Sequence, residues 1–223
     1  MPHCGADRTL AFVIRLYSTT YCPYAWSTRI VLREKEVPFE VFEVDLKAKQ
    51  SEFLRVSPAG KVPVLVDGTT KVWESMVINE YLEERYAGPN LLGDSPGERA
   101  EVRTAILELN STYYQPLAKL AAMLYYGRER RDDERMQRQL DLWDSYLDCL
   151  DEHFCDREWY ALGHFTLADI NLYTMVRVSQ GFGIGIDGAK RKQLQSWLNR
   201  MESRDSVKRS APASIPAAAE LGH

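Results

Sequence analysis

The sequence lacks several features that would mark a specialised class of protein. Its longest apolar runs, such as Leu10 to Ile14 and Val62 to Val66, fall far short of the roughly 20 residues that span a bilayer. It also lacks a basic excess, because 28 Lys and Arg stand against 32 Asp and Glu, a formal net charge of −4. These absences argue against a membrane protein and against direct binding of nucleic acid.

Cysteine and histidine are scarce as well. The four cysteines, Cys4, Cys22, Cys149 and Cys155, are unevenly spaced and lack the density of a secreted disulfide scaffold. The first residues do not read as a signal peptide. We therefore expect a cytoplasmic protein with free thiols. The four histidines show no metal-ligand spacing with the cysteines, so we expect no metal.

What is present is ordinary globular composition, with 45% hydrophobic and 27% charged residues. In the first part of the chain, short β-branched runs alternate with helical periodicity. The pattern predicts strand, helix, strand, short helix, two hairpin strands and a final helix over residues 10–16, 24–35, 39–44, 51–56, 63–66, 71–73 and 74–86. This order implies a mixed sheet with helices packed on it.

The second part of the chain is purely helical in its pattern. Apolar residues recur every three or four positions, which predicts two long helices with a kink at Pro116 in the first. A further helix starts after Thr166, which forms a capping box with Asp169. The predicted division is an α/β domain, a Gly- and Pro-rich linker, an all-helical bundle and a disordered tail, over residues 10–88, 89–97, 98–205 and 206–223.

Cys22 is the most informative residue of the α/β half. It lies between the first predicted strand and the first helix and is followed by Pro23, which suits the first turn of a helix. A thiol at a helix N-terminus meets unpaired N–H groups that stabilise the thiolate and can lower its pKa. Ala25 takes the place of the second cysteine of a Cys-x-x-Cys motif. A mixed disulfide at Cys22 must therefore be resolved by an external thiol.

Four motifs resemble those of the cytosolic glutathione transferase superfamily, over about residues 10–201. They are Cys22-Pro23-Tyr24-Ala25, Lys61-Val62-Pro63-Val64-Leu65, Trp73-Glu74-Ser75 and Thr166-Leu167-Ala168-Asp169-Ile170. The resemblance implies a thioredoxin-like N-terminal domain and a C-terminal helical-bundle domain. The Cys-Pro-aromatic-Ala version is similar to the cysteine-type omega and lambda classes. Tyr17 and Ser18 lie near the place where hydroxyl-dependent classes keep their catalytic group, which leaves a hydroxyl as the alternative.

The resemblance implies a glutathione site around a catalytic Cys22. Pro63 would be a cis-proline, and the backbone of Val62 would pair with the cysteinyl part of glutathione. At the start of a helix, Ser75 would bind the γ-glutamyl carboxylate and Glu74 the amine. The expected glutathione-binding residues are Pro23, Tyr24, Lys49, Lys61, Val62, Pro63, Glu74 and Ser75.

Two parts of this expected site stay open. Either Lys49 or Lys61 would bind the glycyl carboxylate, and a solvated surface charge is the alternative for each. The second substrate would lie above Cys22 against the helical domain. Aromatic side chains are candidates for lining its pocket: Tyr113, Tyr114, Tyr125, Tyr126 and Trp143.

The expected function is a glutathione-dependent thiol transferase or reductase, acting on a small hydrophobic or disulfide substrate, as a homodimer. The Cys22 thiolate would take glutathione from a substrate as a mixed disulfide, and a second glutathione would release it. Deglutathionylation, dehydroascorbate reduction and reductive removal of glutathione from small aromatic conjugates all fit. Conjugation to an electrophile, or ether cleavage, by bound glutathione is the alternative within the enzymes.

A regulator without catalysis is the alternative from another class. Residues 29–32 and 73–83 are similar to stretches of stringent-starvation-type proteins, which associate with RNA polymerase. Those proteins generally lack the Cys-Pro motif at the helix start, whereas this sequence has it at Cys22 and Pro23. The motif therefore favours the enzyme.

Overall fold

A mixed four-stranded sheet forms the first half of the computed structural model, which describes residues 13–115, 117–119, 133–181 and 185–213. Its strands are β1 (Ile14–Ser18), β2 (Phe39–Glu43), β3 (Val64–Asp67) and β4 (Thr70–Trp73), in the order β2-β1-β3-β4. β1 pairs parallel with β2 and antiparallel with β3, and β3 pairs antiparallel with β4. The predicted mixed sheet is confirmed.

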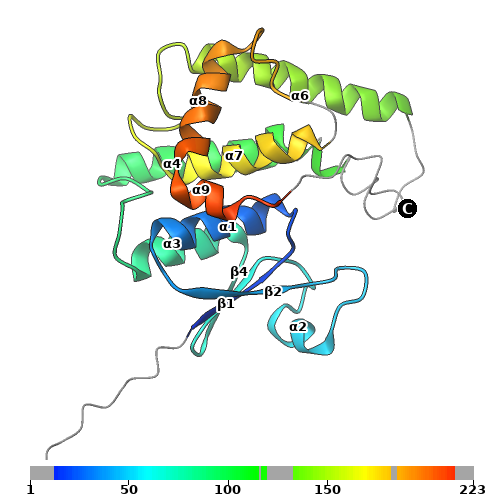
Figure 1. Cartoon of the computed structure of the whole chain (residues 1–223), viewed down its shortest axis with the longest axis vertical. Coiled ribbons are helices and arrows are strands. Elements are labelled where there is room, and N and C mark those ends of the chain that lie inside the picture. Colours follow the sequence, from blue (N-terminus) through cyan, green and yellow to red (C-terminus); the bar gives the residue numbers. More distant parts are fainter. Residues whose placement is uncertain (1–12, 116, 120–132, 182–184, 214–223) are drawn as a thin grey trace, which may run out of the picture.

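Three helices accompany this sheet: α1 (Pro23–Glu34), α2 (Ser51–Val56) and α3 (Ser75–Arg85). α1 provides the crossover that the parallel pair of β1 and β2 needs. Its apolar residues Trp26, Ile30 and Val31 are buried, as their spacing predicts. Figure 1 shows α1 and α3 on one face of the sheet, with the helical half beyond them. The order β-α-β-α-β-β-α is that of the expected thioredoxin-like unit.

The second half consists of helices: α4 (Pro96–Glu108), a π-helix η1 (Leu109–Tyr113), α6 (Asp133–His153), α7 (Leu167–Gln180), α8 (Lys192–Ser203) and α9 (Asp205–Ser210). α4 begins inside the predicted linker, because Ser95 and Glu98 form a capping box around its first turn. The predicted kink at Pro116 lies outside the described residues. The departure from α-helical geometry that is described comes earlier, in η1.

The start of the tail, expected to be disordered from residue 206, is helical instead. Val207 of α9 is 1% exposed, and Ser210 Oγ accepts a hydrogen bond of 3.0 Å from Arg33 Nε of α1. Arg204, just before α9, makes two bonds of 2.9 Å with the carboxylate of Glu34. These contacts with α1 order the first residues of the range expected to be disordered. Residues 214–223 lie outside the described residues.

The two halves share one apolar core. Trp26 of α1 packs edge-to-face against Tyr173 of α7, with ring centroids 5.7 Å apart. Ile14 and Leu16 of β1 belong to this same core, whereas Tyr17 points to the opposite face of the sheet and packs with Phe53 of α2. α1 is therefore held between the sheet and the helical bundle, so its first residue lies close to the boundary between the halves.

A buried carboxylate joins three parts of the helical half. Asp169 accepts bonds from the backbone N–H groups of Tyr160 (2.8 Å) and Thr166 (3.0 Å) and from Trp197 Nε1 (3.0 Å). Burial raises the pKa of Asp169, while these donors lower it. The predicted capping box of Thr166 and Asp169 is confirmed. The same carboxylate also fixes the preceding loop and α8.

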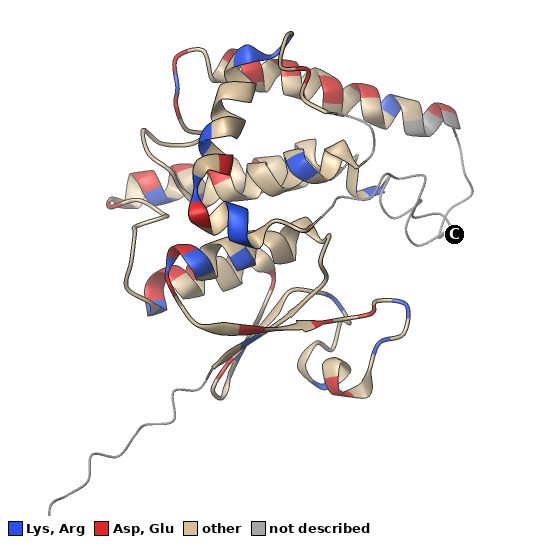
Figure 2. Ribbon diagram, in the orientation of Figure 1, with Lys and Arg blue, Asp and Glu red and all other residues tan. Residues whose placement is uncertain are grey.

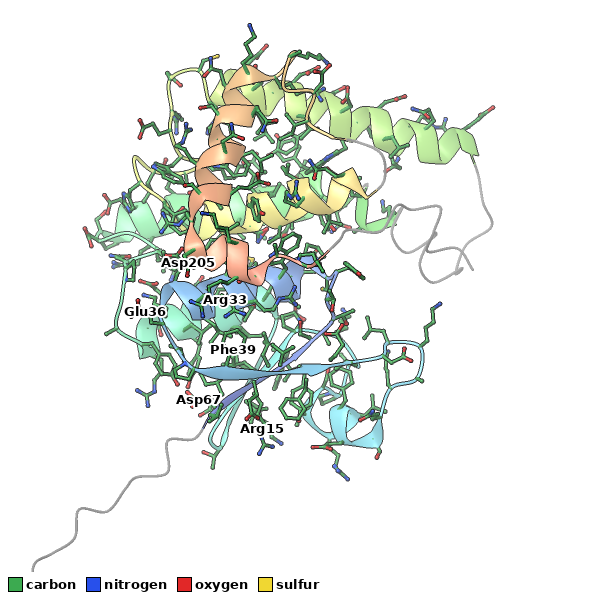
Figure 3. The ribbon with its side chains drawn as sticks, in the orientation of Figure 1. Arg15, Arg33, Glu36, Phe39, Asp67 and Asp205 are labelled. Atoms are coloured by element: carbon green, nitrogen blue, oxygen red, sulfur yellow. The ribbon has the colours of Figure 1, made fainter. Side chains whose placement is uncertain are left out.

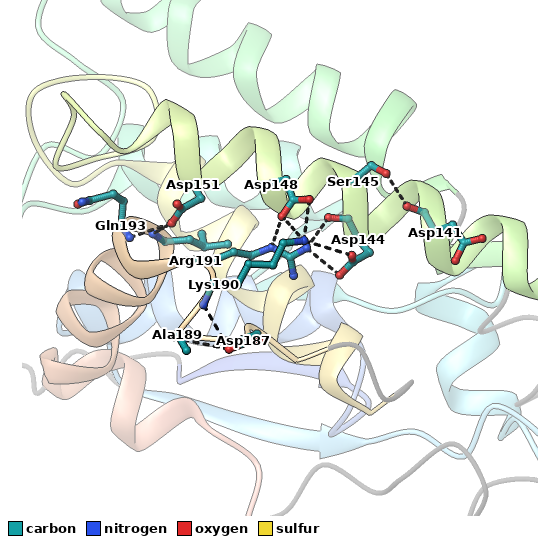
Figure 4. A network of polar contacts seen from close by, with 11 residues as sticks. Asp141, Asp144, Ser145, Asp148, Asp151, Asp187, Ala189, Lys190, Arg191 and Gln193 are labelled. Atoms are coloured by element: carbon teal, nitrogen blue, oxygen red, sulfur yellow. Dashed lines mark hydrogen bonds and ion pairs between the residues drawn. The ribbon is translucent and has the colours of Figure 1, made fainter.

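A charged cluster fastens α6 to α8 (Figure 4). Arg191, just before α8 and 2% exposed, makes a 2.7 Å ion pair with Asp148 of α6. One turn further along α6, the carboxylate of Asp151 accepts bonds of 2.8 and 2.9 Å from the backbone N–H groups of Gln193 and Leu194. A neighbouring helix thus supplies the N-terminal cap that α8 lacks in its own sequence. Figure 2 shows side chains of both charge signs spread over the helices.

Candidate functional site

Cys22 is the N-cap residue of α1, with Pro23 in the first turn. Its backbone is extended, with φ −72° and ψ 116°, and its carbonyl accepts the first helical bond, of 2.9 Å, from the N–H of Trp26. Its own N–H donates to the carbonyl of Thr19 at 3.1 Å. The residue is partly exposed. The prediction of a thiol between β1 and the N-terminus of α1 is confirmed.

The environment of the Cys22 thiol acts on its pKa in two directions. Burial of the sulfur raises the pKa of Cys22 above its ordinary value. The backbone N–H groups of Ala25 and Tyr24, at the start of α1, and the charge of Arg29 lower it by less. The predicted lowering of the Cys22 pKa is therefore wrong as a net effect in the unliganded protein, because desolvation outweighs the helix terminus.

Tyr24 lies close to the thiol, and Glu74 lies close to Tyr24. Burial, followed by the charges of Cys22 and Glu74, raises the pKa of Tyr24 to about 12. The ring of Tyr24 packs edge-to-face on Tyr114, with centroids 5.9 Å apart and planes at 88°. The structure thus brings the starts of α1 and α3 and one aromatic residue of the helical half to a single place.

Glu74 adopts a backbone conformation that only glycine favours. It is the N-cap residue of α3, with φ 68° and ψ 116°. Such a conformation costs about 1–3 kcal/mol in a residue other than glycine. Its side chain is exposed, and the following Ser75 is the first residue of α3 and is buried. The strained turn places a carboxylate and a hydroxyl at the start of α3, at the place that the resemblance implies for them.

The peptide bond between Val62 and Pro63 is cis, as the resemblance implies. The preceding loop is fixed by Ser57, whose hydroxyl accepts a bond of 3.0 Å from the Lys61 N–H and donates one of 2.8 Å to the Lys61 carbonyl. Lys49 lies beside this loop, since its Nζ is 3.0 Å from the point where a Cβ on Gly60 would stand. Both lysines are exposed and border the same loop.

The aromatic residues expected to line the second substrate pocket lie in different parts of the structure. Tyr114 is buried beside Tyr24, whereas Tyr113 stacks on Tyr146, with centroids 3.8 Å apart, in a cavity of about 440 Å³ between α4 and α6. Trp143 is completely buried in the core. Tyr125 and Tyr126 lie outside the described residues. Among the described candidates, only Tyr114 contacts a residue of the Cys22 site.

The two hydroxyl-bearing residues that are alternatives to the thiol are held within the fold, one by packing and one by a hydrogen bond. Tyr17 is buried between Phe42 and Phe53, and Ser18 Oγ accepts a 2.6 Å bond from Arg29 Nη1. This arrangement makes Arg29 part of the site, which the sequence reasoning missed. A charged residue three positions after the buried Trp26 was the signal that could have found it.

Neither a metal site nor a membrane span is found among the described residues. No group of three or more His, Cys, Asp or Glu in this part of the chain could hold a metal ion. None of the helices described is both long and apolar enough to cross a membrane.

Comparison with known proteins gives matches over nearly the whole chain. The families described as "Glutathione S-transferase, N-terminal domain" and "Glutathione S-transferase, C-terminal domain" match residues 16–90 and 113–205. Glutathione S-transferase F10 of Arabidopsis thaliana is 32% identical, over 89% of this chain and 98% of the relative. The stringent starvation protein A homolog of Pasteurella multocida is 28% identical, over 92% of each.

Two further similarities concern part of the sequence and the overall fold. Glutathione S-transferase omega-1 of Sus scrofa is 39% identical over 100 residues, which are 44% of this chain and 41% of the relative. The crystal structure of a glutathione S-transferase from Methylobacillus flagellatus with glutathione bound superimposes with a TM-score of 0.77. It is 24% identical and covers 90% of this chain and 100% of that one. The chain belongs to the cytosolic glutathione S-transferase superfamily.

Proposed function

We propose that this chain is a glutathione-dependent thiol transferase whose nucleophile is Cys22. The observation that carries the proposal is the place of this thiol, at the N-cap of α1 directly before Pro23. The Tyr17 side chain, by contrast, is buried, and the Ser18 hydroxyl accepts a hydrogen bond from Arg29. The 39% identity with an omega-1 transferase over 100 residues supports the same interpretation.

The reaction runs through one mixed disulfide. The Cys22 thiolate attacks the glutathione sulfur of a substrate–glutathione disulfide, so that a Cys22–glutathione bond forms and the substrate leaves as a thiolate. The thiolate of a second glutathione then attacks the glutathione sulfur of the adduct. Oxidised glutathione forms and the Cys22 thiolate is regenerated. Because Ala25 occupies the fourth position of the motif, no second thiol within the motif competes with this step.

Glutathione binding rests on the starts of two helices and one loop. Ser75 and the first N–H groups of α3 suit the γ-glutamyl carboxylate, and the exposed Glu74 suits its amine. The backbone of Val62, before cis-Pro63, suits the cysteinyl part. Either Lys49 or Lys61 pairs with the glycyl carboxylate from the neighbouring loop. A transferase structure with glutathione bound and a TM-score of 0.77 supports this site.

The second substrate lies beside the thiol, against the helical half. Tyr24, with a pKa of about 12, keeps its proton at neutral pH and can donate a hydrogen bond to it. Tyr114 provides an apolar wall behind Tyr24. A small hydrophobic or disulfide substrate fits this combination. A homodimer is part of the proposal and is tested by the mass of the protein in solution.

A regulatory role is the second candidate function. It is favoured by the 28% identity with a stringent starvation protein A homolog, which extends over 92% of both chains. In that case the helical fold would serve as a protein-binding scaffold and Cys22 would not turn over. Catalysis at Cys22 separates the two candidates.

The test is a thiol-transferase assay with a glutathione mixed disulfide and reduced glutathione. The wild-type protein is expected to turn over, and Cys22→Ser is expected to lose at least about a thousandfold in kcat/KM, as removal of a nucleophile does. Cys149→Ser is the matched control, because Cys149 is an exposed free thiol on α6, and it should keep wild-type activity. Absence of turnover in the wild type would reject the transferase and favour the regulator.

A further inference from the structure

Arg29 is a buried cation directed at the loop that carries Cys22. It is 7% exposed, and its guanidinium donates to three successive residues of the β1–α1 connection. Its partners are Ser18 Oγ at 2.6 Å, the Thr19 carbonyl at 3.4 Å and the Thr20 carbonyl at 2.8 Å. All three acceptors are neutral, and one planar side chain holds them together.

The same loop is tied on its other sides. The Thr19 carbonyl that receives Arg29 also accepts the Cys22 N–H at 3.1 Å. Thr20 donates from its N–H (2.6 Å) and its hydroxyl (2.8 Å) to one carboxylate oxygen of Glu43 on β2. The position of Cys22 relative to the first turn of α1 therefore depends on the Arg29 guanidinium through a single shared carbonyl.

The charge of Arg29 has no direct counter-ion in the part of the chain that the structure describes. Among the described residues, Arg29 forms no ion pair with Asp or Glu. The nearby carboxylate of Glu43 accepts hydrogen bonds from Thr20 instead. Burying a cation that has only neutral partners raises the free energy of the folded protein. A negative charge close to this cation is therefore stabilised by electrostatic attraction. The groups whose negative charge acts favourably on Arg29 are Cys22 and Glu43, and Arg33 opposes them.

We propose that Arg29 is a positioning residue for Cys22: it fixes the loop that holds the thiol and supplies the positive charge that stabilises the thiolate. The use of that thiolate rests on the proposed function, whereas the effect of Arg29 on the thiol does not. The other ionisable group that faces Cys22 is Tyr24 of α1, and Glu74 before α3 acts on Tyr24. Glu43 of β2 acts on Arg29 itself.

Arg33 offers a matched control on the same helix. It lies four residues further along α1, where its Nε donates to Ser210 and its guanidinium stands 5.1 Å from the ring centre of Phe39. Figure 3 shows Arg33 beside Phe39 and Asp205. It makes none of the contacts with the β1–α1 loop that Arg29 makes.

The test measures the rate at which iodoacetamide alkylates Cys22 as a function of pH, with peptide mass spectrometry to identify the modified cysteine. In Arg29→Gln the curve for Cys22 should move to higher pH by about one unit, so that alkylation at pH 7 slows about tenfold. Arg33→Gln should follow the wild-type curve. A wild-type curve in folded Arg29→Gln overturns the proposal.

A second variant keeps the test decisive if Arg29→Gln does not fold. Arg29→Lys keeps the positive charge, but an ammonium group cannot donate to all three acceptors as the planar guanidinium does. The alkylation curve of this variant should therefore be shifted to higher pH than the wild-type curve. An unchanged curve in folded Arg29→Lys then overturns the positioning role. Alkylation needs no turnover. A shift in Arg29→Gln without any transferase activity in the wild type would therefore reject the proposed function and leave Arg29 in its role.

Discussion

Two buried arginines of this chain are held in opposite ways. Arg191, before α8, pairs directly with carboxylates of α6, among them Asp148 at 2.7 Å. Arg29, in α1, donates only to neutral oxygen atoms of the β1–α1 loop. The charge of Arg191 is balanced by these carboxylates, and the ion pairs hold α8 against α6. The charge of Arg29 has no carboxylate partner among the described residues, and in our proposal it acts on the thiolate of Cys22.

The comparison extends to the surroundings of each charge. In the helical half, Asp169 receives donors from the backbone and from Trp197, so a buried charge is fully hydrogen-bonded there. Around Cys22 the structure instead keeps a strained turn at Glu74 and a desolvated thiol. The hydrogen-bonded carboxylate of Asp169 stabilises the fold. The strained backbone of Glu74 and the desolvated thiol of Cys22 lie where we propose that the chemistry takes place.

The largest effect on stability is expected for Asp169→Ala. It leaves the buried N–H groups of Tyr160 and Thr166 and the Trp197 Nε1–H without an acceptor, at a cost of at least about 3 kcal/mol in the free energy of unfolding. Urea denaturation followed by circular dichroism measures it. Asp169→Asn keeps the volume and one acceptor oxygen, so it should lose less. Equal losses in the two variants would contradict the role of these bonds.

Arg191→Gln should have the next largest effect. It removes a buried cation from its carboxylates and loosens α8 on α6, which we expect to cost about 2 kcal/mol. The cost should appear as a lower urea midpoint with an unchanged rate of Cys22 alkylation. A change of Cys22 reactivity in this variant would break the distinction between the two arginines.

Acid should weaken the α6–α8 contact in a defined range. Arg191, followed by Lys190, holds the pKa of Asp148 below its ordinary value. A carboxyl whose pKa is lower in the folded state contributes stability above its unfolded pKa and loses it as the pH falls through the folded value. The loss should therefore begin near about pH 4.

The measurement is the urea midpoint of wild type and Asp148→Asn from pH 7 down to pH 2. The difference between the two proteins should shrink as the pH falls. Asp141→Asn is the control, since Asp141 lies on the same helix and its side chain contacts Gln137 rather than α8. A difference that stays constant with pH would contradict the assignment.

The smallest effect is expected for Tyr24→Phe. It removes the hydroxyl beside the thiol and keeps the ring that packs on Tyr114, so kcat with a disulfide substrate should fall by about two- to tenfold, the worth of one neutral hydrogen bond. Stability should not change. A loss as large as that of Cys22→Ser would make Tyr24 part of the chemistry rather than of substrate binding.

Local signals in the sequence predict much of this architecture. The element order follows from periodicity, and the place of Cys22 from the Cys-Pro step between a strand and a helix. The capping box of Thr166 and Asp169 is formed within four consecutive residues of the sequence. Each of these features depends on neighbours in the chain, so the sequence contains them directly.

The rest depends on contacts between distant segments. The raised pKa of Cys22 comes from desolvation in the folded protein. Arg29 matters because it hydrogen-bonds to residues that precede it by nine to eleven positions. α9 is ordered by Arg33 and Glu34, whose contacts with it lie about 170 residues away in sequence. Composition of the tail alone could not reveal these partners.

The central claim is that Cys22 itself takes up glutathione. Incubation of the intact protein with oxidised glutathione, followed by peptide mass spectrometry, tests it most directly. We predict one glutathione per chain, located on Cys22, absent in Cys22→Ser and removed by reduced glutathione. An unmodified Cys22, or glutathione only on the exposed Cys149 or Cys155, would contradict the account.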